Sequence, residues 1–406
     1  MKRAIALMTF IVAASTHAHA QVAPTATGGN ASMQYSLRYS QIAEIYGGSQ
    51  GDQQKATASG DFKYIRHNEH LPFSLLYGGG YSWNLSGGSY GNGFFENLLL
   101  TQGIIGRNWS VAFEDNVSYR KEAPTTGFSG VAGTGEPIGQ PSPTPPTSQS
   151  VLSLNTSTVN NTATGVFTLK INQATSVSAG GGSELLAFPD GGGQNTDSLS
   201  ANASLKQRLN SRNSLSVLYL LTYYSYPGSD TTFNSNILLA SYERAWSRHL
   251  SSTVGAGPEW INSSNPSIVP SSTRITANAT ASYSFRSGSA SLTYRHATSG
   301  GGGYYFGAEA DTVSAAYSRE IGRKLTFELT SGYRRTTGLM NNGTTNADFG
   351  AAQATRKLGR SFSLFGSYTA TVQSTSSTLP SSALSGLLQV IDVGISYTPR
   401  ERQFRH

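Results

Sequence analysis

Hydrophobic and polar residues alternate strictly along the stretch from Arg274 to Arg286. Its odd positions carry Ile, Ala, Tyr and Phe, whereas its even positions carry Thr, Asn, Ser and, at both ends, Arg. A period of two is typical of a β-strand whose two faces meet different environments. The stretch therefore predicts one strand of a transmembrane β-barrel, with lipid outside and water inside.

The same alternation recurs between about residues 31 and 399, for example from Met33, from Leu215 and over the final Ile391–Tyr397. We therefore predict an all-β fold, an antiparallel up-and-down transmembrane β-barrel. One strand, starting at Trp109, carries Asp115 on its apolar face, which lipid should reject. There we expect either a bulge that shifts the register or a strand that starts to leave the membrane.

Tight polar connections repeat along the second half of the chain and predict the number of strands. Their basic residues lie 36, 38, 37 and 37 positions apart and are Arg212, Arg248, Arg286, Arg323 and Arg360. Such a period indicates repeated supersecondary units, here two strands with one short turn and one longer loop. Extending it backward places short turns near positions 174, 107 and 70. Eight short turns predict about eighteen strands, and sixteen remains the alternative if the region 152–185 pairs differently.

The ends of the chain and one internal segment fall outside this pattern. Residues 1–20 have a basic start, an apolar run and an Ala18-His19-Ala20 site, which predict a signal peptide cleaved after Ala20. Residues 21–30 are predicted to be a flexible arm, residues 31–399 the barrel and residues 400–406 a C-terminal tail. Residues 122–150 hold six of the fifteen prolines and are predicted to form a long outer loop.

Composition fits a barrel and excludes several other classes. Only 13% of the 406 residues are charged and 37% are hydrophobic, with a mean hydropathy of −0.28, so a bundle of membrane helices is not indicated. The absence of cysteine excludes disulfides and thiolate metal sites. The net charge of +7 includes two basic residues of the signal peptide and no basic run, so we expect no nucleic-acid partner. A soluble sandwich array or solenoid is the alternative, but its core would need more Val and Ile.

Aromatic residues gather where strands should cross the two membrane interfaces. On the loop side they are Tyr81, Trp83, Tyr223, Tyr224 and Tyr304–Phe306, and on the turn side Trp109, Trp246, Phe285, Phe362 and Tyr397. We interpret both groups as lipid-facing girdles.

Charged residues on the opposite parity are the candidate lumen residues. The basic ones are Arg38, Lys55, Lys63, Lys206, Arg208, Arg274, Arg295 and Arg334, and the acidic ones are Asp61, Glu328 and Asp392. A cation-rich face over a water-filled lumen should concentrate anions. The alternative is that these residues form salt bridges within the wall.

Catalytic constellations are not apparent. His296 precedes Ser299 by three residues, but a serine-rich chain produces that neighbour by chance. No metalloprotease, phosphate-loop or nucleophile-elbow motif is found. We therefore predict no enzyme activity, no cofactor and no metal.

The signal peptide, the alternating strands and the closing Val390–Tyr397 resemble Gram-negative outer-membrane β-barrels, most closely porin-like barrels of this size. The resemblance implies the cell outer membrane, with its lipid and lipopolysaccharide, insertion by the barrel-assembly machinery and small solutes as partners. Such barrels usually end in an aromatic residue, whereas here Tyr397 or Phe404 would take that role. The expected function is a water-filled channel for passive diffusion of small solutes, with a preference for anions as its expected selectivity. The alternatives are a non-conducting surface, adhesion or envelope scaffold protein and an export channel for an acidic polysaccharide.

Overall fold

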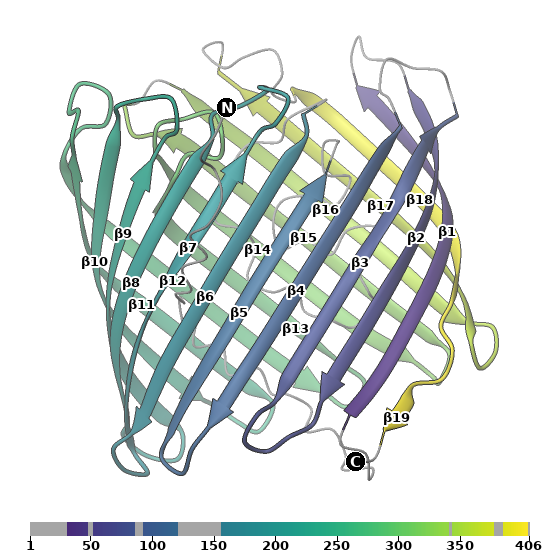
Figure 1. The fold of residues 1–406 in the computed structure, drawn as a ribbon, viewed down its shortest axis with the longest axis horizontal. Coiled ribbons are helices and arrows are strands. Elements are labelled where there is room, and N and C mark those ends of the chain that lie inside the picture. Colours follow the sequence, from purple (N-terminus) through teal and green to yellow (C-terminus); the bar gives the residue numbers. More distant parts are fainter. Residues whose placement is uncertain are drawn as a thin grey trace, which may run out of the picture.

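The computed structural model describes residues 31–47, 52–85, 92–120, 156–340, 343–376 and 385–404. These residues form a closed antiparallel β-barrel (Figure 1). The strands are β1 (Ala31–Gly47), β2 (Gln53–Arg66), β3 (Phe73–Asn84), β4 (Gly93–Ile105), β5 (Trp109–Arg120), β6 (Thr158–Lys170), β7 (Thr175–Ala187), β8 (Thr196–Arg208), β9 (Asn213–Ser225), β10 (Thr232–Ala245), β11 (Leu250–Ser263), β12 (Ser272–Phe285), β13 (Gly288–Ser299), β14 (Ala308–Ile321), β15 (Leu325–Gly338), β16 (Thr344–Lys357), β17 (Phe362–Thr375), β18 (Gly386–Tyr397) and β19 (Arg402–Phe404). Among these residues no helix is long and apolar enough to cross a bilayer. The predicted signal peptide, N-terminal arm and 122–150 loop lie outside the described residues, as do residues 405–406 of the tail.

The ring closes between its first and last long strands. Each long strand pairs with its neighbours in the chain, and β1 pairs with β18 from Leu37↔Tyr397 to Gly47↔Leu387. Closure leaves no free sheet edge, which lipid would not tolerate. The prediction of eighteen strands is confirmed over the alternative of sixteen. With strands about 4.8 Å apart and tilted as in known barrels, the ring is roughly 35 Å across.

In the described strands the outward face is largely apolar and the inward face largely polar, with outward polar exceptions at Asp115, Asn161, His296, Glu309 and Asp311. Outward side chains include Leu37, Val254 and Ile275, which are 56%, 57% and 68% exposed. Because partners in an antiparallel ladder share a face, the register carries this alternation from strand to strand around the whole ring. The central prediction from the sequence, one face for lipid and one for water, therefore holds in three dimensions.

Asp115 keeps its outward position, so of the two expected explanations the bulge is wrong. The β4–β5 ladder is continuous from Phe95↔Arg120 to Ile105↔Ser110 and shows no extra residue. The carboxylate instead accepts a hydrogen bond of 2.8 Å from Asn161 Nδ2 on β6. A neighbouring polar side chain on the same face thus satisfies Asp115 within the wall.

Eight short turns connect the long strands on one side, at the predicted positions. In four of them one Asn or Ser side chain accepts hydrogen bonds from two backbone N–H groups: Asn68 from His70 and Leu71, Asn172 from Ala174 and Thr175, Asn210 from Arg212 and Asn213, and Ser247 from His249 and Leu250. Asn and Ser at such positions stabilise a tight turn by replacing a backbone acceptor. The repeat in the sequence therefore reflects the geometry of these turns.

The last residues of the chain, within the predicted C-terminal tail, add a short piece of wall. β19 pairs with the start of β1, from Ala31↔Phe404 to Met33↔Arg402, on the lower rim in Figure 1. Compared with the β18 register, this pairing is shifted by one residue. The shift corresponds to a bulge between β18 and β19.

Three lumen-facing glycines lie beneath phenylalanine rings of the adjacent strand. The pairs are Gly80↔Phe95, Gly332↔Phe349 and Gly394↔Phe365. A Cβ atom at any of these glycines would collide with the ring. Aromatic cover of a glycine in a neighbouring strand stabilises a sheet where the glycine itself offers no side chain.

Candidate channel lumen

All eleven predicted lumen residues belong to the inward parity of their strands. The register also places charged residues there that the sequence analysis omitted. The added acidic residues are Glu44, Glu114, Glu184, Glu243, Glu259 and Glu320, and the added basic ones are Arg120, Lys170 and Lys357. The charge of the lumen wall is therefore much closer to neutral than the predicted set alone indicates.

Four of the predicted cations form ion pairs. Arg38 lies 3.4 Å from Asp61, Lys55 lies 3.0 Å from Glu44 and Lys206 lies 2.6 Å from Glu243. Arg274 pairs with Glu309. These residues fit the alternative reading of salt-bridged wall positions.

Within the described residues, Lys63, Arg208 and Arg295 have no ion-pair partner. Lys63 and Arg208 lie close to the short turns at the ends of β2 and β8. Arg295 lies higher in the wall, in one row with Thr312 and Arg334, because Arg295↔Thr312 and Thr312↔Arg334 are ladder pairs. Two strand spacings separate the arginine backbones, roughly 10 Å. The row forms a positive band on the lumen wall.

The two predicted acidic residues outside these pairs are separate from one another. Glu328 lies on β15, nearer the short turn than Arg334. Asp392 on β18 faces Ser367 and Ile42 across its two ladders and is 2% exposed. The structure therefore does not bring the eleven predicted lumen residues together into a single site.

The mouth of the barrel is crossed by the connection Gly300–Gly307 between β13 and β14, which we call the mouth loop. Its Gly303 carbonyl accepts a 2.7 Å hydrogen bond from Gln194 N between β7 and β8. On the other side, Tyr305 Oη lies 3.0 Å from Thr345 Oγ1 on β16. Four of the loop glycines have positive φ, between 63° and 88°, a conformation that side chains disfavour. The loop thus reaches from one part of the wall to another.

An apolar cluster anchors the mouth loop from below. Its buried members are Tyr226, Phe233, Ile261, Val269 and Leu339. Tyr226 Oη donates a 3.1 Å hydrogen bond to the Gly300 carbonyl. Burial raises the pKa of the Tyr226 phenol well above its ordinary value, as does nearby Tyr224, so this donor keeps its proton.

Three residues of the predicted girdle belong to this interior instead, among them Phe306, whose ring lies 4.9 Å from that of Tyr226. Tyr224 is on the lumen parity, paired with Phe233 and stacked on its ring at 4.5 Å between centroids. Tyr305 is only 2% exposed. Alternation alone would have separated Tyr224 from its outward neighbour Tyr223, but a loop tyrosine such as Tyr305 carries no such signal.

Both ring nitrogens of His296, the histidine considered as a catalytic base, already have carboxylate partners. His296 Nε2 lies 2.7 Å from Glu309 Oε1, and Nδ1 lies 2.8 Å from Asp311 Oδ1. Ser299 Oγ contacts the Ala308 carbonyl at 3.4 Å and not the imidazole. Among the described residues no group of three or more His, Cys, Asp or Glu side chains is arranged to hold a metal ion.

A closed eighteen-strand ring, apolar outside and polar inside, with short turns on one side, defines a transmembrane β-barrel of the porin-like, outer-membrane type. No protein-family model matches the sequence, and no curated protein matches it significantly.

Solved structures with a similar fold include OccAB3 of Acinetobacter baumannii and OccK2 (OpdF) and OccK9 (OpdG) of Pseudomonas aeruginosa. OccAB3 is 10% identical with a TM-score of 0.48, over 92% of this chain and 100% of that chain. OccK2 is 10% identical with a TM-score of 0.48, and OccK9 is 10% identical with a TM-score of 0.47, each over 91% of this chain and 98% of that chain. This similarity says nothing about what the present chain transports.

Proposed function

We propose that the chain forms a water-filled channel in a bacterial outer membrane, through which small hydrophilic solutes diffuse. The observation that supports this most directly is the polar inner face of a ring of eighteen strands. Barrels of sixteen to eighteen strands leave an aqueous passage unless loops fill it. Export by a signal peptide cleaved after Ala20, insertion by the barrel-assembly machinery and contact with lipopolysaccharide belong to the same proposal.

The preferred solutes of this channel are small anions, and the preference is weak. Four lumen cations are neutralised by carboxylates, so they add little to the field in the lumen. Arg295 remains, exposed and directed toward the passage, with Arg334 two strands away in the same row. A concentrated positive band raises the local concentration of anions.

Reversal potentials in a potassium chloride gradient test this selectivity. We expect chloride to permeate about twice as readily as potassium, and Arg295→Gln to bring that ratio to about one. Arg319→Gln is the matched control, because Arg319 pairs with outward Phe327 on the lipid-facing parity of β14. A cation preference in the unmodified channel, or equal effects of the two substitutions, would contradict the assignment.

A non-conducting scaffold is the second candidate, and the anchored mouth loop favours it. The loop is hydrogen-bonded to parts of the wall on either side of its own hairpin, so it narrows the passage. Swelling of liposomes in sugars of graded size separates the two functions. Swelling with small sugars supports the channel, and the absence of both swelling and conductance supports the scaffold. Passage of an acidic polysaccharide would require the mouth loop to move aside.

A further inference from the structure

The hydrogen-bond ladder between β12 and β13 stops before the strands end. Its last pair toward the mouth is Ala277↔His296, although β12 begins at Ser272 and β13 continues to Ser299. On the outer sides of this seam the ladders continue, to Ile261↔Ser272 and to Ser299↔Ala308. In the part of the chain that the structure describes, the other ladders on this side leave at most three residues of either strand unpaired, whereas this ladder leaves five residues of β12 unpaired. Something other than backbone pairing must therefore hold this seam.

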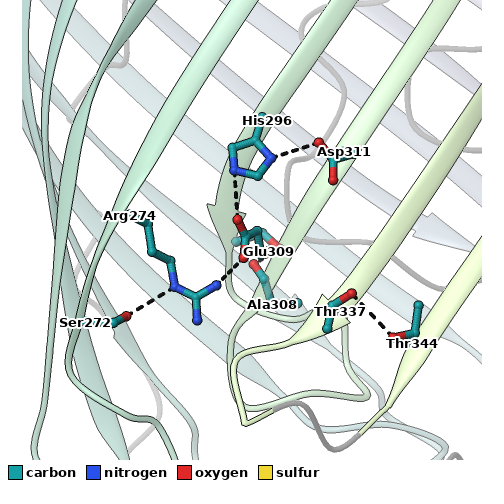
Figure 2. Close-up of polar contacts among 9 residues, drawn as sticks. Ser272, Arg274, His296, Ala308, Glu309, Asp311, Thr337 and Thr344 are labelled. Atoms are coloured by element: carbon teal, nitrogen blue, oxygen red, sulfur yellow. Dashed lines mark hydrogen bonds and ion pairs between the residues drawn. The ribbon is translucent and has the colours of Figure 1, made fainter.

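Side chains bridge the seam (Figure 2). Arg274 Nη1 of β12 contacts Glu309 Oε2 of β14, and Glu309 Oε1 contacts the His296 ring of β13 at 2.7 Å. The other ring nitrogen of His296 lies 2.8 Å from Asp311 Oδ1. We call Arg274, His296, Glu309 and Asp311 the seam cluster. Thr276 Oγ1 adds a 2.9 Å hydrogen bond to the His296 carbonyl.

The contacts of the seam cluster depend on its carboxylates being ionised. Nε2 of His296 lies against Glu309 and Nδ1 lies against Asp311, and an ionised carboxylate can only accept hydrogen bonds. The other titratable or charged groups facing the ring are Tyr294 on its own strand, whose Oη lies 3.1 Å from Asp311 Oδ1, and Arg335, the β15 ladder partner of Asp311. Protonation of Glu309 or Asp311 removes the negative charges that hold Arg274 and His296.

The hairpin held by this cluster is also the one that carries the mouth loop. β13 and β14 run directly into Gly300–Gly307, and Leu339 N and Gln194 N tie that loop to the rest of the mouth. Its His296, Glu309 and Asp311 lie on the outward parity, within four residues of the mouth end of β13 and β14, and the cluster's side-chain exposures lie between 21% and 40%. Protons therefore reach it without unfolding of the barrel.

We propose that the β12–β13 seam is a movable joint and that the seam cluster is its pH-sensitive latch. At neutral pH the ion pairs keep the hairpin against β12. Acidification releases them, the upper part of the hairpin separates from β12, and the mouth loop moves with it. This inference rests on the proposed channel function, because the loop movement is expressed as gating.

Single-channel recording at pH 7 and pH 4 tests the latch. We expect about threefold more gating events at pH 4 than at pH 7, since roughly half of ordinary Asp and Glu side chains are protonated at the lower value. Glu309→Gln should show the acid behaviour already at pH 7. Glu320→Gln is the matched control, a carboxylate of the same strand at the short-turn end with no ion pair among the described residues. Gating by Glu309→Gln at pH 7 that matches wild type would overturn the proposal.

A cross-link supplies a second test, in a chain that has no cysteine of its own. Continuing the β12–β13 register places Ile275 opposite Thr298, so Ile275→Cys with Thr298→Cys should form a disulfide that locks the seam. Oxidation should abolish the pH effect and reduction should restore it. A pH response that persists in the oxidised protein would contradict the latch.

A third readout separates this proposal from the channel itself. The single variant Thr298→Cys is first exposed briefly to a water-soluble mercurial at pH 7 or pH 4, because mercurials react with thiols at both values. The thiols that remain free are then counted with a water-soluble maleimide at pH 7. Fewer free thiols after the pH 4 exposure support the joint even if no variant conducts, whereas the absence of all conductance overturns only the channel. Equal reaction at both pH values overturns the joint.

Discussion

The sector around β1 and β2 and the sector from β12 to β14 both contain paired charges, but in different surroundings. The β1–β2 ladder is complete from Ala31↔Arg66 to Glu44↔Gln53, and its Lys55–Glu44 pair is 5% and 1% exposed. The seam cluster lies at the mouth end of β12 and β13, where backbone pairing between these two strands has stopped, and its side chains are partly exposed. Burial therefore decides what such a pair does. A buried pair is costly to break and fixes the wall, whereas a hydrated pair is cheap to break and suits a joint.

The largest expected effect comes from breaking the buried pair. Lys55→Met leaves Glu44 charged and buried with one cation fewer, and we expect the free energy of unfolding to fall by about 3 kcal/mol. Urea unfolding in lipid vesicles, followed by tryptophan fluorescence, measures the loss. Lys63→Met, on the same strand and without an ion pair among the described residues, should cost much less. Equal losses would remove burial as the explanation.

An intermediate effect is expected where a ring covers a glycine. Phe349 lies over Gly332, is 7% exposed and packs with Ile42 and Val390 on the lumen side. Phe349→Ala should lower the free energy of unfolding by about 2 kcal/mol, less than in a core enclosed on all sides. Phe349→Leu should recover most of this loss. If Ala and Leu are equally well tolerated, the ring does not stabilise the wall.

The smallest effect on global stability is expected at the seam. Glu309→Gln should change the free energy of unfolding by only about 0.5 kcal/mol, because the pair is screened by water. Amide hydrogen exchange in the last residues of β13, followed by mass spectrometry, should nevertheless become faster. A global loss as large as that of Lys55→Met would show that the seam cluster is part of the fixed wall and would break the comparison.

Alternation and turn chemistry predicted most of the fold. The alternation within a strand such as β12 shows which residues lie on each of its two faces. Similar polar residues recur in turns such as Asn210–Asn213 because the backbone N–H groups of each turn need a side-chain acceptor. Strand number followed from the period of those turns. These features are local, so one sequence is enough to show them.

The lumen was less accessible to sequence reasoning, because its chemistry depends on pairing between strands. Glu44 and Glu243 neutralise Lys55 and Lys206 from other strands, and nothing near those lysines indicates it. Inward apolar residues such as Phe233 blur the alternation where the mouth is packed. Asp115 appeared to require a bulge or a strand that leaves the membrane, because the side chain that satisfies its carboxylate, Asn161, lies 46 positions away in the sequence.

The alternation of inward and outward side chains along every long strand of the described ring also constrains which insertions and deletions its gene can tolerate. Inserting or deleting one codon within any long strand would turn every later side chain of that strand over, so that serines would meet acyl chains and leucines would meet water. Length variation among descendants should therefore be confined to the connections between strands or occur in steps of two residues.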